Sequence, residues 1–187
     1  MNAFEVLEVA QKPVVDSELL KERLHQLSKT HHGEADGDSS EQWHQINAAY
    51  QILTGDVSRL RHLLELNGEE GLNDSAVVPE EVMELFGTVG PALHQADEVI
   101  RQMDAAESAL EKAMLQEDVM TLAMDLQQRA AQVGEFRSKL VRGIATLDKT
   151  WEKKPQIDPL KTHYRQLVYV ARWAHQLDEK LFRLMNF

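Results

Sequence analysis

The feature that most constrains the fold is a seam of apolar residues near the end of this 187-residue chain. Eight residues recur there at steps of three or four: Leu160, Tyr164, Leu167, Ala171, Ala174, Leu177, Leu181 and Leu184. Because an α-helix has about 3.6 residues per turn, this spacing puts all eight on one helical face. Such a face is stable when it packs against other helices, so the seam predicts a helical bundle.

Three further helical segments precede the seam and complete the predicted bundle. Pro79 stands where a first helical turn would begin, and Glu80 and Glu81 suit the positive end of a helix. We expect Gly90-Pro91 to break or kink this helix. The second segment carries Leu93, Val99, Met103, Leu110 and Met114. The third carries Leu122, Leu126, Ala130, Val133, Leu140, Ile144, Leu147 and Trp151, and we expect the segments to pack as an antiparallel bundle.

The first half of the chain also has helical periodicity and no strand pattern. Asp16-Ser17-Glu18 is an N-cap signal that opens a helix with Leu20, Leu24 and Leu27 on one face. Residues 30–39 have two glycines and no helical period, so we expect a loop there. Ser39 and Gln42 are spaced as a capping box that opens the next helix. Short helices around residues 4–9 and 57–66 would clamp this pair, which predicts a hairpin of two antiparallel helices.

The chain divides near a short acidic stretch, Glu69-Glu70-Gly71-Leu72-Asn73-Asp74-Ser75, which lies between two strong helical patterns. Glycine and asparagine in such a position indicate a linker. We therefore predict an N-terminal domain over 1–70, a linker over 71–78 and a C-terminal domain over 79–187. The predicted fold class is all-α, with a helical hairpin followed by an antiparallel helical bundle.

Composition excludes several classes of function. The 31 acidic residues outnumber the 20 basic ones and give a formal net charge of -11, which repels phosphate backbones, so we expect no nucleic-acid partner. The absence of cysteine excludes disulfides, thiolate metal sites and a cysteine nucleophile, and it fits a reducing cytoplasm. No apolar run approaches the roughly 20 residues that span a membrane, and no signal-peptide pattern is evident. We expect a cytoplasmic protein with no membrane partner.

Several motifs of the first half resemble a J-domain. Phe4-Glu5-Val6-Leu7 looks like the opening of such a domain, and Ile46-Asn47-Ala48-Ala49-Tyr50-Gln51-Ile52-Leu53 is similar to the Ile-Asn-x-Ala-Tyr run of its third helix. Arg61-His62-Leu63-Leu64-Glu65-Leu66-Asn67-Gly68 and the chain end, residues 176–187, resemble the HscB family. These are J-protein co-chaperones for iron–sulfur cluster assembly. The resemblance implies a J-domain-like hairpin, a C-terminal bundle and a function without enzymatic activity.

The J-domain motif that contacts the chaperone is altered in this chain. In the family, a Tyr-His-Pro-Asp loop follows the second helix and stimulates the ATPase of a DnaK- or HscA-type chaperone. The same spacing from Leu27 puts His31 at the tyrosine, His32 at the histidine, Gly33 at the proline and Glu34 at the aspartate. Glycine removes the restraint that proline sets on the turn, so the resemblance implies weakened stimulation.

The second helix of a J-domain also presents a basic face to the chaperone. The matching cations here are Lys21, Arg23 and Lys29, and Asp16, Glu18 and Glu22 offset them. The alternative interpretation is that residues 30–39 form a solvent-exposed loop that makes no contact with a chaperone.

In the HscB family the C-terminal bundle holds the scaffold protein IscU through an apolar patch. The resemblance puts Val82, Met83 and Phe86 near the contacts of the first bundle helix, and Tyr169 on the aromatic contact of the last helix. A second candidate set is Val99, Ile100 and Met103. The alternative reading is that all of these are core residues, since apolar stripes usually are. Val82 and Met83 are adjacent and cannot both lie at the centre of one narrow stripe, which favours partial exposure.

Three functions follow from these observations. The favoured one is an HscB-like co-chaperone that binds an IscU-like scaffold and delivers it to a DnaK/HscA-type chaperone. The close alternative is a J-like adaptor or scaffold protein without chaperone activation. A remote alternative is a small helical metalloprotein, because His25, His31, His32 and His44 lie near Glu34, Asp36 and Asp38. No HExxH or repeated Glu-x-x-His pattern supports it, so we expect neither metal nor cofactor.

Overall fold

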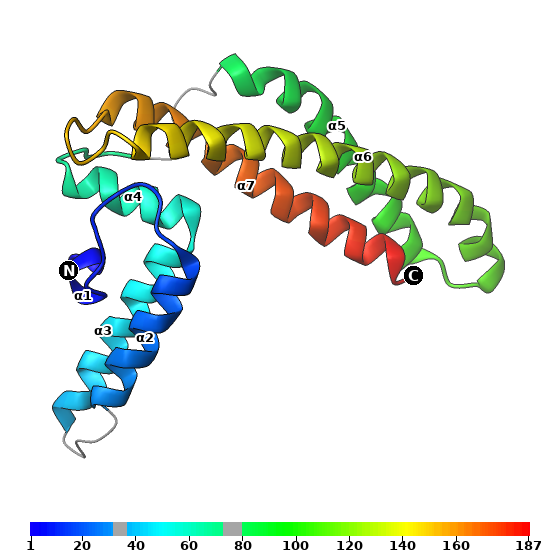
Figure 1. Cartoon of the computed structure of the whole chain (residues 1–187). Coiled ribbons are helices and arrows are strands. Elements are labelled where there is room, and N and C mark those ends of the chain that lie inside the picture. The colour runs from blue at the N-terminus through cyan, green and yellow to red at the C-terminus, as the bar shows by residue number, and fades with distance from the viewer. Residues whose placement is uncertain (32–36, 73–79) are drawn as a thin grey trace. The chain divides into compact units, whose positions relative to one another are not determined.

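The computed structural model describes residues 1–31, 37–72 and 80–187, and its regular elements are seven helices (Figure 1). They are α1 (Ala3–Val6), α2 (Ser17–His31), α3 (Gly37–Thr54), α4 (Asp56–Leu66), α5 (Glu80–Ala105), α6 (Ala109–Asp148) and α7 (Ile157–Met185). These residues contain no strand, which confirms the predicted all-α class.

The chain forms two compact units. The first unit comprises Met1–Ser75 and Val141–Tyr164, and the second comprises Ala76–Leu140 and Arg165–Phe187. The predicted boundaries placed 141–164 with the bundle, whereas the compact units place it with the N-terminal residues. Two contacts explain this grouping: the Val14 N–H donates to Asp148 Oδ1 at 2.9 Å, and Lys161 forms an ion pair with Glu69. A linker over 71–78 stays a prediction.

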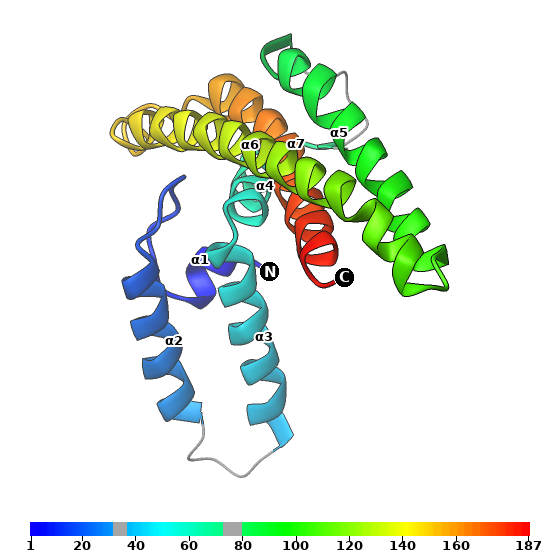
Figure 2. The same ribbon diagram turned by 90° about the vertical axis from the view of Figure 1, so that its right-hand side faces the viewer.

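The centre of the first unit is a hairpin of α2 and α3, with α1 and α4 packed against α3 (Figures 1 and 2). Asp16 caps α2 as predicted, because its Oδ1 accepts a hydrogen bond from the Glu18 N–H at 2.9 Å. The fully buried core is mostly leucine and phenylalanine: Phe4, Leu7, Leu20, Leu53, Leu60, Leu63 and Leu64. Burial of these side chains from four helices holds the hairpin in one register.

The predicted loop over 30–39 was too long. Helix α2 continues to His31 and α3 begins at Gly37, so Ser39 lies inside α3 and does not cap it. Helix α3 therefore begins nine residues before Ile46, which is buried, so the helix is longer than the apolar pattern that predicted it. For this reason the loss of periodicity did not mark the helix boundary.

In the second unit α5 and α7 run in the same direction. Three contacts join the two helices: Phe86 with Trp173, Asp97 with Lys180, and Asp104, which accepts from Arg183 at 2.7 Å. Along this series the residue number increases on both helices, so the two helices are parallel. Helix α6 connects the two and runs in the opposite direction (Figure 1). The seam is confirmed: Leu160, Tyr164, Leu167, Leu177 and Leu184 are buried, and the other members of the seam are half-buried.

Of the break or kink predicted at Gly90-Pro91, the break is absent, because α5 continues through Pro91 to Ala105. Pro91 lacks the N–H that would bond to the Gly87 carbonyl, and the loss of one bond leaves the rest of the helix intact. The break comes at 106–108 instead, so Leu110 and Met114 belong to α6 and not to the segment that carries Leu93.

A capping box that the sequence analysis missed marks the start of α6. The Ser108 Oγ accepts from the Glu111 N–H at 3.2 Å, while Glu111 Oε2 accepts from the backbone N–H groups of Ser108 and Glu107 at 3.0 and 2.9 Å. These hydrogen bonds lower the pKa of Glu111. The signal was the spacing Ser-x-x-Glu, which defines such a box.

Candidate protein-binding surfaces

Predicted contact residues from two distant parts of the second unit meet around one tryptophan. Met83 and Phe86 lie one turn apart on α5, and each is 51% exposed. The Phe86 ring centroid lies 6.3 Å from that of Trp173 on α7, and the Tyr169 ring lies 6.0 Å from Trp173. Trp173 itself is only 6% exposed, so it forms the floor beneath the other rings. We call Met83, Phe86, Tyr169 and Trp173 the aromatic face.

The other predicted contact residues lie in the core. Val82 is fully buried, so it cannot contact a partner and its inclusion in the predicted patch is corrected. Val82 and Met83 point to different sides because successive residues on a helix are about 100° apart. The second candidate set, Val99, Ile100 and Met103, is also buried, so it contributes to packing and not to the surface. Trp173 is itself a core residue, and it supports the rings of Phe86 and Tyr169 from beneath.

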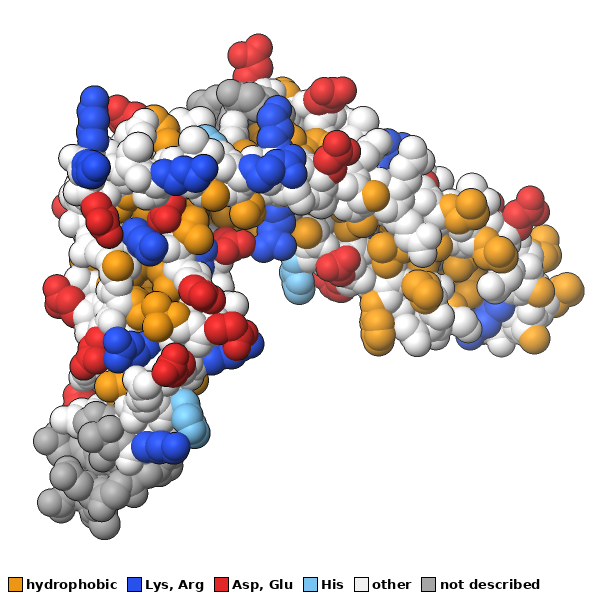
Figure 3. Space-filling model, in the orientation of Figure 1, with side chains coloured by type: hydrophobic (Ala, Val, Ile, Leu, Met, Phe, Trp, Pro, Cys, Tyr) orange, Lys and Arg blue, Asp and Glu red, His pale blue; other side chains and the backbone are white. Residues whose placement is uncertain are grey.

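The predicted basic face of α2 is offset by acidic neighbours. Lys21 Nζ lies 2.7 Å from Glu18 Oε1, and this hydrogen bond and the carboxylate charge raise the pKa of Lys21. Arg23 lies 3.4 Å from Glu8, and Lys29 is exposed. Figure 3 shows acidic and basic side chains interspersed over the hairpin. The remaining predicted contact residues, His32, Gly33 and Glu34, lie outside the described residues.

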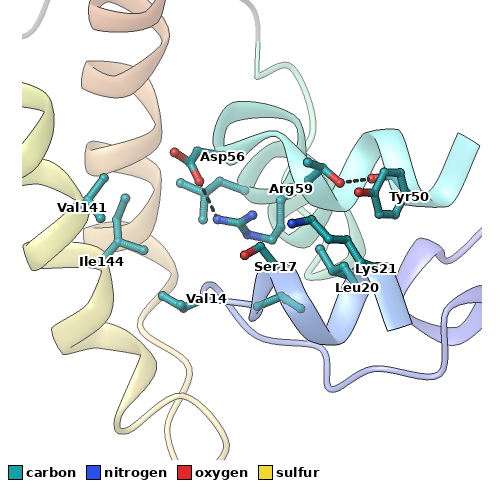
Figure 4. A pocket seen from close by; sticks show the side chains of 12 residues that line it. Val14, Ser17, Leu20, Lys21, Tyr50, Asp56, Arg59, Val141 and Ile144 are labelled. Carbon is teal, nitrogen blue, oxygen red and sulfur yellow. Dashed lines mark hydrogen bonds and ion pairs between the residues drawn. The ribbon is translucent and has the colours of Figure 1, made fainter. Parts of the chain in front are cut away.

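A cavity of about 240 Å³ lies in the first unit, between the N-terminal segment, α2, α3, α4 and the end of α6 (Figure 4). Its wall includes Lys21 and the buried Arg59. Arg59 donates to the carbonyls of Pro13 and Leu53 at 2.8 and 2.7 Å and to Asp56 Oδ1 at 2.8 Å. Because these bonds use each of its nitrogens, Arg59 serves to join the N-terminal segment to α3 and α4.

His62 is a structural residue rather than a ligand. Its Nε2 accepts a hydrogen bond from the Ala3 N–H at 3.0 Å, and its ring stacks on Phe4 at 5.8 Å. Partial burial lowers the pKa of His62, which keeps the imidazole neutral and able to accept this bond.

The structure adds no support for the metal hypothesis. Among the described residues no three His, Cys, Asp or Glu side chains gather where they could hold a metal ion. His32, Glu34 and Asp36, which motivated the hypothesis, lie outside that part of the chain. In the described segments, no helix combines the length and the apolar composition that a membrane span requires.

These features define the class: an all-helical protein with a J-domain-like hairpin, a helical C-terminal region and an exposed aromatic face. Comparisons with known proteins agree with that class, although no family model matches the chain. A co-chaperone protein HscB homolog from Shewanella halifaxensis is 33% identical over 88 residues, which cover 43% of this chain and 51% of that relative. Another from Shewanella loihica is 26% identical over 163 residues, which cover 80% of this chain and 92% of the relative.

A solved structure extends the similarity to the fold. The chaperone HscB from Vibrio cholerae superposes with a TM-score of 0.59 at 22% identity, and the match covers 96% of each chain. The expected resemblance to the HscB family is therefore confirmed, at modest sequence identity.

Proposed function

We propose that this protein is a non-enzymatic, HscB-like co-chaperone of the cytoplasm that acts in iron–sulfur cluster assembly. In this role it binds an IscU-like scaffold protein and delivers it to a DnaK/HscA-type chaperone. The names of the relatives support the co-chaperone role. The observation that carries the proposal is the aromatic face, in which the ring of Phe86 from α5 and the ring of Tyr169 from α7 both lie beside Trp173.

The aromatic face has the physical properties of a protein-binding surface. Phe86 and Met83 expose half of their surface to water, and covering such side chains is favourable by about 25 cal/mol per Å² of apolar area. Large aromatic residues over a rigid floor are typical of the residues that dominate binding energy. Val82 is left out of the proposed contact set because it is buried.

The test is the affinity of the full chain for an IscU-like scaffold protein, measured by titration calorimetry. We expect Phe86→Ala to weaken binding by about tenfold or more, which corresponds to about 1.4 kcal/mol. Phe182→Ala is a matched control, since Phe182 is also an exposed phenylalanine of the second unit, 69% exposed. Equal affinities for wild type and Phe86→Ala, or equal losses in the two variants, would contradict the proposal.

We further propose that stimulation of the chaperone ATPase is weakened. The proposal rests on Gly33 and Glu34, which stand where the family has proline and aspartate. Addition of the protein to a DnaK/HscA-type chaperone should leave its ATPase rate nearly unchanged, and Gly33→Pro with Glu34→Asp should raise it. A several-fold stimulation by wild type that is lost in His32→Gln would contradict weakened activation and restore the full co-chaperone function.

The same residues favour a second candidate function, that of an adaptor without chaperone activation. Scaffold binding with no stimulation, even in the repaired Gly33→Pro/Glu34→Asp variant, would support the adaptor. Elemental analysis of the purified protein tests the metalloprotein alternative, which stoichiometric bound metal would favour.

A further inference from the structure

The first half of α6 has apolar residues on two opposite sides. On the inner side Val119, Leu122 and Leu126 are buried. On the outer side four apolar residues are exposed: Leu110 by 72%, Met114 by 74%, Met120 by 62% and Met124 by 69%. We call these four residues the outer stripe. Because the inner side already supplies the packing of the second unit, the outer stripe is not needed for the core.

The outer stripe runs along one side of the helix, and the exposed Glu117 lies at its midpoint. At about 100° per residue its four members fall within an arc of about 120°, and at about 1.5 Å per residue they extend over about 21 Å. Figure 3 shows hydrophobic side chains gathered at the end of the second unit where α6 begins and α7 ends. These dimensions match the apolar face of a partner helix of about four turns.

The choice of residue also indicates a binding surface. Six of the seven methionines of this chain are exposed, and Met103 alone is buried. Methionine is flexible and polarisable, so an exposed methionine-rich surface adapts to varied apolar partners. Three of the four members of the outer stripe are methionines.

Charge distinguishes between the occupants that could cover this surface. Between residues 107 and 128 there are five acidic residues and one basic residue, Lys112. Glu111 and Asp118 are exposed and fall along one edge of the outer stripe, at about 80° to 100° from Leu110, and Glu107 is exposed just before the helix begins. This edge repels anionic lipid headgroups and attracts lysine and arginine.

A second copy of the chain is a poor occupant for the same reason. In an antiparallel pairing of two α6 helices, Leu110 would meet Met124 and Met114 would meet Met120 of the other copy. Glu117, exposed at the midpoint of the outer stripe, would then face its own copy. Two like charges at the centre of an apolar interface are unfavourable.

We propose that the outer stripe binds an amphipathic helix of a partner protein, with an apolar face for the methionines and with lysine or arginine opposite Glu117 and along one edge. This is the helix-in-groove type of recognition, in which side chains at i, i+3, i+4 and i+7 anchor the helix. The surface is distinct from the aromatic face, and the inference does not depend on the proposed function.

The experiment uses the full chain and a helical peptide of about 15 residues, with leucines at i, i+3, i+4 and i+7, lysines along one edge and one lysine opposite Glu117. Fluorescence anisotropy should show binding that Met114→Ser/Met120→Ser weakens about tenfold. Leu19→Ser/Met185→Ser is the matched control, since it alters two exposed apolar residues outside both the outer stripe and the aromatic face and should bind as wild type does. A peptide with glutamates in place of the lysines should bind about tenfold more weakly.

Three results would overturn the inference. The first is equal binding of the lysine peptide by wild type and Met114→Ser/Met120→Ser, which would assign the binding to net charge. The second is equal binding of the two peptides. The third is a concentration-dependent dimer in sedimentation that Met114→Ser/Met120→Ser abolishes, which would assign the outer stripe to a second copy.

Discussion

Arg59 shows how one buried charge organises the first unit. It is 8% exposed, and it reaches residues on three separate segments: Pro13, Leu53 and Asp56. The planar guanidinium suits this task because its nitrogens donate in fixed, divergent directions. Sequence periodicity could not reveal Arg59, since position 59 carries no apolar signal. Only the Asp56-x-x-Arg59 spacing hinted at a local ion pair.

We predict that Arg59→Ala lowers the free energy of unfolding by about 3 kcal/mol, because it leaves two buried carbonyls and Asp56 without their donor. Arg59→Lys should recover only part of this loss, since one ammonium cannot reach three acceptors in place of the fork. Urea unfolding of the full chain measures both. Arg61→Ala is the control: Arg61 pairs with Glu65 on the exposed side of α4, and its loss should change stability by less than about 0.5 kcal/mol. A similar change in both arginine variants would show that burial of Arg59 is unimportant.

His62 makes the stability of the first unit depend on pH. Burial lowers its pKa in the folded state below the ordinary value of 6.5, so the unfolded chain binds the proton more readily. The contribution of His62 to stability is therefore complete above pH 6.5 and declines as the pH falls below that value. Protonation also abolishes the acceptor for the Ala3 N–H. We predict that lowering the pH from about 7.5 to about 5 reduces the free energy of unfolding more for wild type than for His62→Gln. Parallel stability curves for the two proteins would contradict this role.

At the scale of the helices, the sequence predicted those elements whose apolar face is long and buried. The α7 seam, the N-cap of α2 at Asp16 and the paired helices of the hairpin were all predicted correctly. The errors lie where local chemistry competes with periodicity. Gly90-Pro91 was expected to break or kink a helix that continues through it, and the break at 106–108 is marked by a capping box at Ser108 that the pattern of apolar residues does not contain.

Gly143 makes a close approach of α6 and α7 possible within the first unit. A Cβ at position 143 would come within 2.9 Å of His163 Cδ2, and the His163 ring is held by a 2.9 Å hydrogen bond from Nδ1 to the Pro159 carbonyl. Alanine normally stabilises a helix by about 1 kcal/mol relative to glycine. We predict that Gly143→Ala gives this gain only when His163 is also changed to alanine. A double-mutant cycle by thermal or urea unfolding measures the coupling, and additive effects would show that the ring moves aside freely.

For the whole molecule, the sequence predicted two helical domains, and the structure has two compact units whose composition differs from those domains. Residues 141–164 join the first unit through Asp148 and Lys161, whose partners are more than 90 positions away in the sequence. Such contacts leave no periodic signal. The aromatic face was partly predictable, because the resemblance pointed to Met83, Phe86 and Tyr169. The exclusion of Val82 and the inclusion of Trp173 required the three-dimensional arrangement of α5 and α7.

The central claim is that the aromatic face of the second unit binds the scaffold protein. Hydrogen–deuterium exchange of the full chain, with and without a saturating IscU-like scaffold, tests it most directly because it reports every helix at once. We predict that scaffold binding slows exchange in α5 around Met83 and Phe86 and in α7 around Tyr169 and Trp173, while α2 and α3 are unchanged. Protection confined to the hairpin or to the outer stripe of α6, or no protection anywhere at saturation, would contradict the claim.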